Sequence, residues 1–271
     1  MNAQSTQKIA VLGIDLGKQT FHVHGVDARG EVILRKKMTR TKLTEFLARL
    51  EPCLIGMEAC GGAHHWARLC QRFDHDVRLM SPQFVKPYLK SNKNDYLDAE
   101  AICEAVQKPN MRFVAIKSVD QQAIQGLHRA RSLAVGQRTV LINQIRGLLL
   151  EHGITLPQGA HVIRKALPEL LEDAENALGF ALRELLAELL EAMIHADERV
   201  GAYDRKIAVL SQQDEPCRRL LSIPGIGPLI ATALVAAVGS GQVFNNGREM
   251  AAWLGLVPRQ HSTWPLGPVR H

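Results

Sequence analysis

The chain has 271 residues, enough for one large domain or two modest ones, and no apolar run reaches the roughly 18 residues that would span a membrane. Hydrophobic residues make up 46% of the chain, so it can bury a substantial core, and a net charge of +6 favours a polyanionic partner. The five cysteines are scattered and form no CxxC pair, which argues against a disulfide framework or a zinc site. Because residues 1–8 are polar and lack the apolar stretch of a signal peptide, we expect a cytoplasmic protein with no membrane association.

The first 117 residues carry alternating strand and helix patterns. Apolar runs and turn residues predict strands at 9–14, 20–26, 31–37, 53–57 and 77–80, and helices at 41–50, 63–73, 83–89 and 95–107. Thr41 is the expected cap of the first helix. The first three strands form a predicted antiparallel meander, after which helix and strand alternate. This order is that of the ribonuclease H-like α/β fold, an inference by analogy at the level of the fold.

After residue 117 the pattern becomes helical. Residues 121–152 are typical of one long helix. Between 177 and 210, apolar residues recur at spacings of four and three: Leu182, Leu186, Leu189, Met193, Ala196, Val200, Tyr203, Ile207 and Leu210. This heptad pattern favours a coiled coil or a long helical hairpin, paired with another helix across a dimer, although an ordinary amphipathic helix on its own domain would look similar. We therefore assign 1–117 to the α/β domain, 118–215 to a helical region, and 216–271 to a small helical C-terminal domain.

Four acids form the main candidate site. Asp15 and Glu58 each end a predicted strand, and Asp95 and Asp98 stand three residues apart at a helix start, where they share one face. Four carboxylates that converge would repel one another unless a cation neutralised them, and oxygen ligands suit Mg²⁺. A metal site of this kind stabilises charge in phosphodiester chemistry. The alternatives are a turn aspartate for Asp15 and ordinary first-turn acids for the helix pair.

Two further features indicate nucleic-acid binding. The turn at 224–227, with Gly225 and Gly227, matches a helix-hairpin-helix, which offers backbone N–H groups to a phosphate, although a tight turn that binds nothing is the alternative. Basic residues cluster at 35–42 and at 86–93, and three lie within about an 80° arc of the long helix: Arg131, Arg138 and Arg146. Any one cluster could be a solvated face, but together, beside four acids, they favour nucleic acid.

The chain resembles the DEDD-type insertion-sequence transposases, the one-ten family of bridge-RNA-guided recombinases. The matching segments are GIDLGK (13–18), GMEACGGAHHW (56–66), NDYLDAEAI (94–102), residues 128–153, and the stretches 220–239 and 251–262. The resemblance implies a ribonuclease H/RuvC-like N-terminal domain whose acids, Asp15, Glu58, Asp95 and Asp98, hold Mg²⁺. It also implies DNA as a substrate, a guide RNA, a homo-oligomer (dimer or tetramer), and a C-terminal domain that supplies a serine nucleophile for DNA recombination.

The sequence departs from the family after the stretch PRQHS. The family usually continues with Gly-Gly-Lys, a basic segment and a final helix, whereas this chain has 263–271 in their place. Ser262 is the nearest candidate nucleophile, and depending on the alignment Thr263 could hold that position. We therefore expect metal and DNA binding with impaired strand exchange.

Two other functions compete with a transposase. A catalytically inactive nucleic-acid-binding remnant would fit the altered tail. An actin-like sugar kinase or ATPase would use Gly13–Gly17 as a phosphate loop, but the second phosphate loop and adenosine motif that such an enzyme needs are not found in the sequence.

Overall fold

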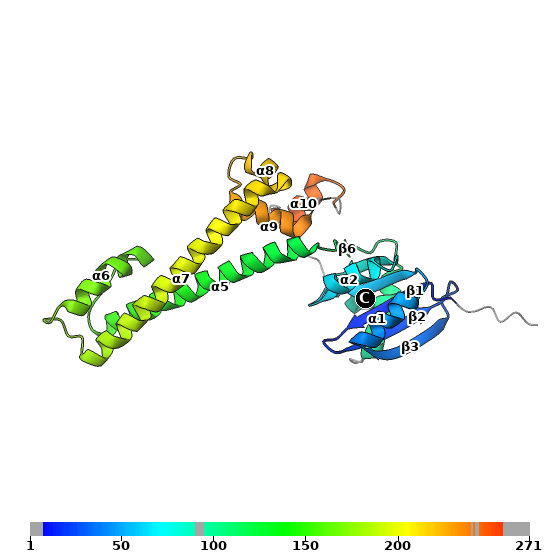
Figure 1. Cartoon of the computed structure of the whole chain (residues 1–271), viewed down its shortest axis with the longest axis horizontal. Helices are drawn as coiled ribbons and strands as arrows, with labels where there is room; N and C mark the ends of the chain where they lie inside the picture. Colours follow the sequence, from blue (N-terminus) through cyan, green and yellow to red (C-terminus); the bar gives the residue numbers. More distant parts are fainter. Residues whose placement is uncertain (1–7, 90–94, 240, 242–243, 257–271) are drawn as a thin grey trace, which may run out of the picture. The chain divides into compact units, whose positions relative to one another are not determined.

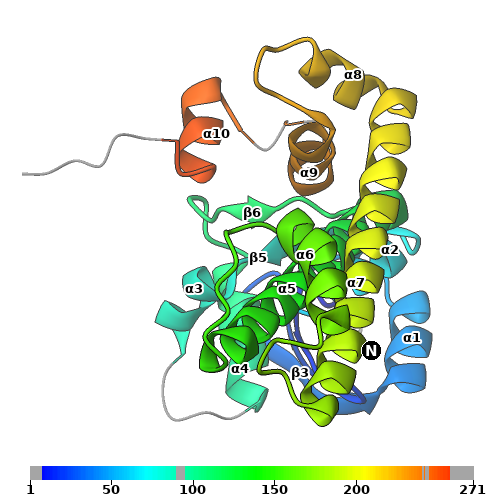
Figure 2. The same cartoon turned by 90° about the vertical axis from the view of Figure 1, so that its left-hand side faces the viewer.

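The computed structural model describes residues 8–89, 95–239, 241 and 244–256. The chain forms two compact units, residues 1–116 with 240–271 and residues 117–239. Figures 1 and 2 show the elements of each unit from two directions. Of the helices that the structure describes, none is both long and apolar enough to cross a lipid bilayer.

A six-stranded mixed sheet organises the first unit. Its strands are β1 (Val11–Leu16), β2 (Thr20–Val26), β3 (Val32–Thr39), β4 (Leu54–Glu58), β5 (Asp76–Met80) and β6 (Phe113–Val114). Their order across the sheet is β3-β2-β1-β4-β5-β6. The first three strands pair antiparallel, β1 pairs parallel with β4 and β4 with β5, and β6 returns antiparallel. The predicted antiparallel meander is therefore confirmed, and the structure adds that the strands after it pair in parallel.

Helices cover both faces of this sheet. Because strand side chains alternate between faces, Leu12 and Ile14 join the core beneath α1 (Arg40–Arg49) and α2 (Ala63–Gln71). The other face packs against α4 (Asp95–Ala105), whose Ile102 shares a second core with Val11. The alternation places the side chain of Asp15 on the α4 face as well, next to the first turn of that helix.

Several local predictions need correction. The first helix begins at Arg40, so its N-cap is Thr39 rather than Thr41, and no side chain caps it by a hydrogen bond. The helix expected at 83–89 divides into α3 (Pro82–Val85) and the 3₁₀ turn η1 (Lys86–Tyr88). The reason is Pro87, which lacks an N–H group and whose ring would clash with a carbonyl four residues earlier.

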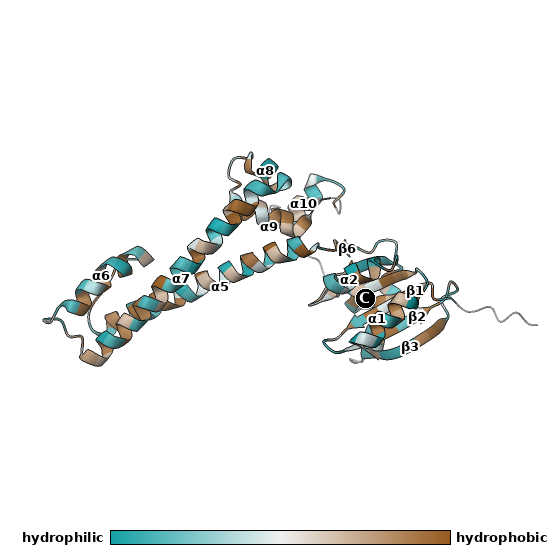
Figure 3. Cartoon of the chain, in the orientation of Figure 1, coloured by the Kyte–Doolittle hydropathy of each residue, from teal (hydrophilic) through white to brown (hydrophobic). Residues whose placement is uncertain are grey.

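Two long helices form the core of the second unit. The predicted long helix is confirmed as α5 (Val119–Glu151), with a capping box between Ser118 and Gln121. The heptad segment lies within α7 (Phe180–Gln213), and α7 packs along α5 (Figure 1). Hydrophilic and hydrophobic residues alternate along both helices (Figure 3), and the apolar ones meet in a shared core. The seam therefore has partners within its own chain, in a helical hairpin, and pairing across a dimer stays a prediction.

Shorter helices complete the described residues. α6 (Ala160–Glu172) was not anticipated, since Pro168 interrupts its pattern, yet it buries Ile163 and Leu167 against the hairpin. α8 (Glu215–Leu221) and α9 (Pro228–Val238) flank the glycine turn, and α9 packs on α5 and α7. α10 (Gly247–Trp253) is capped by the side chain of Asn246.

Candidate metal centre

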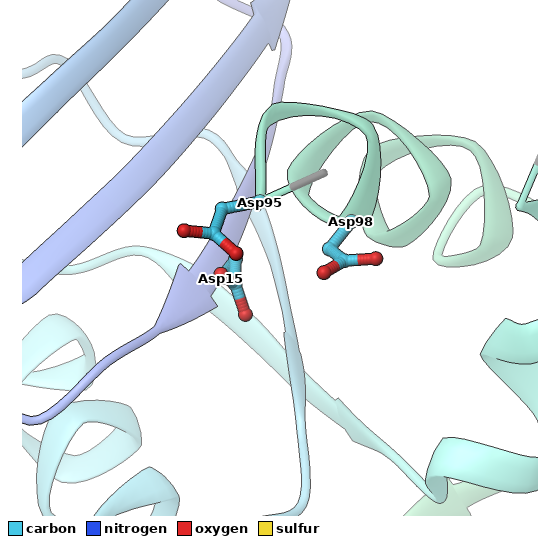
Figure 4. Close-up of side chains that lie close together, drawn as sticks. All are labelled: Asp15, Asp95 and Asp98. Carbon is cyan, nitrogen blue, oxygen red and sulfur yellow. The ribbon is translucent and has the colours of Figure 1, made fainter. Parts of the chain in front are cut away.

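Three aspartates gather beside the end of β1. Asp15, near the end of the strand, and Asp95 and Asp98, from the first turn of α4, each offer a carboxylate oxygen, and these oxygens all lie within 4.8 Å of one another. Figure 4 shows the three side chains between the strand end and the helix start. Asp15 and Asp98 are half-buried, and Asp95 is exposed. The structure thus brings Asp15 together with two aspartates that lie 80 and 83 positions further along the sequence.

Two glycines allow α4 to approach the sheet closely enough to build this cluster. Gly13 and Gly56 are register partners on the neighbouring strands β1 and β4. A Cβ atom on Gly13 would lie 2.2 Å from the carbonyl oxygen of Ala99, and one on Gly56 would lie 2.8 Å from the Cβ of Val106. Any other residue type at Gly13 would have to displace α4, and one at Gly56 would have to displace Val106, which directly follows α4.

The fourth predicted acid, Glu58, ends β4 and lies near Asp15 and Asp98. It is half-buried, and the negative charges of Asp15 and Asp98 act on it. It is not a member of the group whose oxygens lie within 4.8 Å of one another. Glu58 therefore forms the edge of the acidic site rather than its centre.

The pKa values of Asp15 and Glu58 are raised by burial and by neighbouring acids. Burial contributes most to the raised pKa of Asp15, and the charges of Asp98 and Asp95 raise it further. Burial likewise raises the pKa of Glu58, with Asp15 and Asp98 adding to the shift. Three carboxylate oxygens within 4.8 Å of one another are a set of donors that fits a hard divalent cation such as Mg²⁺.

The matches to known proteins cover most of the sequence. Residues 12–154 match a family described as "Transposase", of the DEDD IS110 type, and residues 217–263 match "Transposase IS116/IS110/IS902 family". A probable family 20 transposase of Pseudomonas aeruginosa is 47% identical over 93% of this chain and 75% of its own length. The transposase for insertion sequence element IS1328 of Yersinia enterocolitica is 43% identical, over 94% of this chain and 75% of that protein. The transposase for insertion sequence element IS1111A of Coxiella burnetii is 41% identical, over 96% of this chain and 71% of that protein.

The chain belongs to the IS110 family of transposases. It is therefore an enzyme that acts on DNA, as the sequence resemblance implied.

The structure adds His22, which sequence reasoning missed, to the surroundings of the acids in this transposase. His22 is the register partner of Asp15 on β2, and its side chain is buried. Its Nδ1 atom lies 3.9 Å from Oδ2 of Asp15 and 3.8 Å from Oδ2 of Asp95. The antiparallel turn between β1 and β2 could have predicted this pairing, because it sets the register of the two strands.

The three arginines proposed to bind nucleic acid make contacts inside the second unit. Arg131 pairs with Asp204 and Arg138 with Asp197, so both tie α5 to α7. Arg146 donates a hydrogen bond to the backbone carbonyl of Pro157. Their arc thus coincides with the side of α5 that faces the rest of the unit.

The glycine turn between α8 and α9 has an open geometry. Gly225 has φ +87°, a conformation that favours glycine, and added Cβ atoms at Gly225 and Gly227 would meet no atom within 4 Å. Pro228 then starts α9, where its missing N–H costs nothing. Pro224 and Gly225 are exposed, so the tip of this turn is open to solvent, as phosphate binding would require.

The nucleophile candidates Ser262 and Thr263 lie outside the described residues.

Proposed function

We propose that this transposase carries out metal-dependent cleavage and strand transfer at insertion-sequence ends, with its active site on the α4 face of the sheet. The observation that carries the proposal is the convergence of Asp15, Asp95 and Asp98 within 4.8 Å, with Glu58 at the edge. The strand order, with three antiparallel strands followed by two parallel ones, supports a ribonuclease H/RuvC-like fold for residues 1–117.

In this proposal the four acids hold Mg²⁺. Bound there, the ion would supply Lewis-acid stabilisation of the charge that develops at a scissile phosphate. The protein's own part is to place the carboxylates, and β1 and α4 do so through the close packing at Gly13 and Gly56. Preorganised ligands of this kind need little rearrangement when the substrate binds.

Ser262 is the proposed nucleophile, with Thr263 as the alternative. A serine hydroxyl is a weak nucleophile unless a base or a metal-bound phosphate activates it, so it would have to reach the acids during the reaction.

A guide RNA and a homo-oligomer, dimer or tetramer, are proposed from the family resemblance. The turn at Gly225 and Gly227 and the arginines of α5 are proposed contacts to nucleic acid, and impaired strand exchange stays a prediction.

The test is an assay of the full chain with Mg²⁺, guide RNA and element-end DNA. We expect cleavage to be lost in Asp98→Asn and retained in Asp120→Asn, since Asp120 is likewise a first-turn helix acid but belongs to no acidic cluster among the described residues. A protein–DNA adduct on a denaturing gel that Ser262→Ala abolishes would identify the nucleophile. Full cleavage by Asp98→Asn would refute the proposed active site.

A further inference from the structure

Strand β3, at the edge of the sheet, carries three consecutive cations, Arg35, Lys36 and Lys37, and all three are exposed. Among the residues that the structure describes, no carboxylate forms an ion pair with any of them. An unneutralised basic strip at a sheet edge attracts polyanions, and it also discourages pairing with another strand.

The register of the strands shows which of these cations share a face with the acids. Asp15 is opposite His22, and His22 is opposite Lys37, so the three side chains form one row across β1, β2 and β3. The neighbouring row places Arg35 opposite His24. Lys36 instead pairs with Val23, on the opposite face of the sheet. Arg35 and Lys37 thus lie on the acid side of the sheet, and Lys36 does not.

Ring contacts connect Arg35 to the acidic site. Its guanidinium carbon lies 5.1 Å from the ring centroid of Tyr96, a typical cation–π arrangement. The ring of Tyr96 in turn meets the ring of His22 edge-on, with centroids 4.7 Å apart. Tyr96 follows Asp95 directly in the first turn of α4, so these contacts hold the Arg35 side chain beside the turn that presents the acids.

A nucleic-acid strand that reaches the acids must place a chain of negative charges beside a negative site. A divalent cation would offset the repulsion at the scissile phosphate only, and the flanking phosphates would still need cationic partners. Lys37 is two strand spacings from Asp15, about 10 Å across the sheet. That separation suits a flanking phosphate rather than the reacting one.

We propose that Lys37 and Arg35, the latter held in place by Tyr96, bind the phosphodiester backbone of the strand that enters the acidic site. The inference rests on the proposed function of the acids. The ligand chemistry is the sugar–phosphate backbone, and its source is either the DNA substrate or an RNA strand.

The experiment measures binding of the full chain to a fluorescein-labelled single strand of about 30 nucleotides, as DNA and as RNA of the same sequence, at several salt concentrations. Each phosphate contact on a single strand contributes about 0.7 to the slope of log K against log salt, so Arg35→Gln with Lys37→Gln should lower the slope by about 1.4 and weaken binding about tenfold. The matched double variant, Lys36→Gln with Lys42→Gln, removes the same charge from the other face and should bind within about twofold of the wild type.

A change with the DNA probe, the RNA probe or both supports the proposal and identifies the source of the backbone. Equal losses in the two double variants, or an unchanged slope in the Arg35/Lys37 variant, would overturn it. The affinity for Mn²⁺ is measured in parallel, and both double variants should bind Mn²⁺ as tightly as the wild type. A lower Mn²⁺ affinity in the Arg35/Lys37 variant would mean that the substitutions disturbed the acidic site itself, and this result would also overturn the proposal. Retained Mn²⁺ affinity in Asp98→Asn would count against the proposed function alone.

Discussion

Aspartates occupy opposite electrostatic settings in the two units of this transposase. On the α4 face, Asp15 lies among other acids, and its pKa is raised by burial and by its neighbours. In the hairpin, Asp197 lies between Arg138 and Arg164, and the hydrogen bond from Arg138 is the main reason why its pKa is lowered. Arginines of the same unit thus neutralise Asp197, whereas at Asp15 burial and the neighbouring acids outweigh the opposing effect of His22. This contrast is the reason why we propose the acidic cluster, rather than the charged groups of the hairpin, as the metal site.

The largest expected effect comes from removing one charge from the acidic site. Asp98→Asn should lower the rate of Mg²⁺-dependent DNA cleavage by about 100-fold or more, because a metal at such a site contributes several kcal/mol. Asp197→Asn, which also removes one aspartate charge, should leave the cleavage rate within about twofold. Similar losses of cleavage rate in Asp98→Asn and Asp197→Asn would show that the acidic cluster is no more important for cleavage than the charge pairs of the hairpin.

A second test acts on the backbone beneath the acids. Gly13→Val should lower the free energy of unfolding by roughly 1–3 kcal/mol in urea denaturation, because the new side chain overlaps the backbone of α4. It should also weaken Mn²⁺ binding. Gly61→Ala, at a position where an added Cβ meets no atom within 4 Å, is the control and should change neither quantity appreciably.

The charge pairs of the hairpin should give a smaller effect. Asp197→Ala leaves Arg138 and Arg164 without their shared partner and should cost about 1 kcal/mol of unfolding free energy. Since the pKa of Asp197 is lowered in the folded state, its contribution is present above the ordinary value of 3.8 and lost as pH falls through the lowered pKa. Urea denaturation of the wild type and the variant between pH 7 and pH 3 measures this, and a difference that grew on acidification would contradict it.

The smallest expected effect is a gain in stability, whereas the preceding variants are expected to lose activity or stability. In the absence of metal, Asp15→Asn should slightly raise the thermal midpoint at neutral pH, because it relieves the repulsion that raises the pKa of Asp15. The gain should shrink as the pH falls through that raised pKa, where the wild-type carboxyl takes up a proton. A lower midpoint for the metal-free variant at pH 7 would show that the carboxylate stabilises the fold instead.

Local patterns predicted the elements that build the site. The apolar run before Asp15 and the alternation in β2 predicted two adjacent strands, and the first-turn acids Asp95 and Asp98 predicted the start of α4. Contacts between distant segments were harder to predict. His22 was missed because its closeness to the acids depends on the register between β1 and β2 rather than on any motif.

The α5 arginines show why a helical arc of cations is ambiguous. Their arc also carries apolar residues, and in the structure that side of α5 packs against α7. Arg131 and Arg138 accordingly meet aspartates of α7, partners that lie 73 and 59 residues away in the sequence. Periodicity along one helix could not identify these partners, because they come from the returning helix of the hairpin.

The most direct test of the acidic cluster as a metal centre is a titration of the full chain with Mn²⁺. Electron paramagnetic resonance monitors the binding, and no nucleic acid is present. We predict saturable binding by the wild type and by Asp120→Asn, and a loss of about 100-fold or more in affinity for Asp15→Asn and Asp98→Asn. Equal Mn²⁺ affinity in all four proteins would contradict the assignment of the acidic cluster as a metal centre.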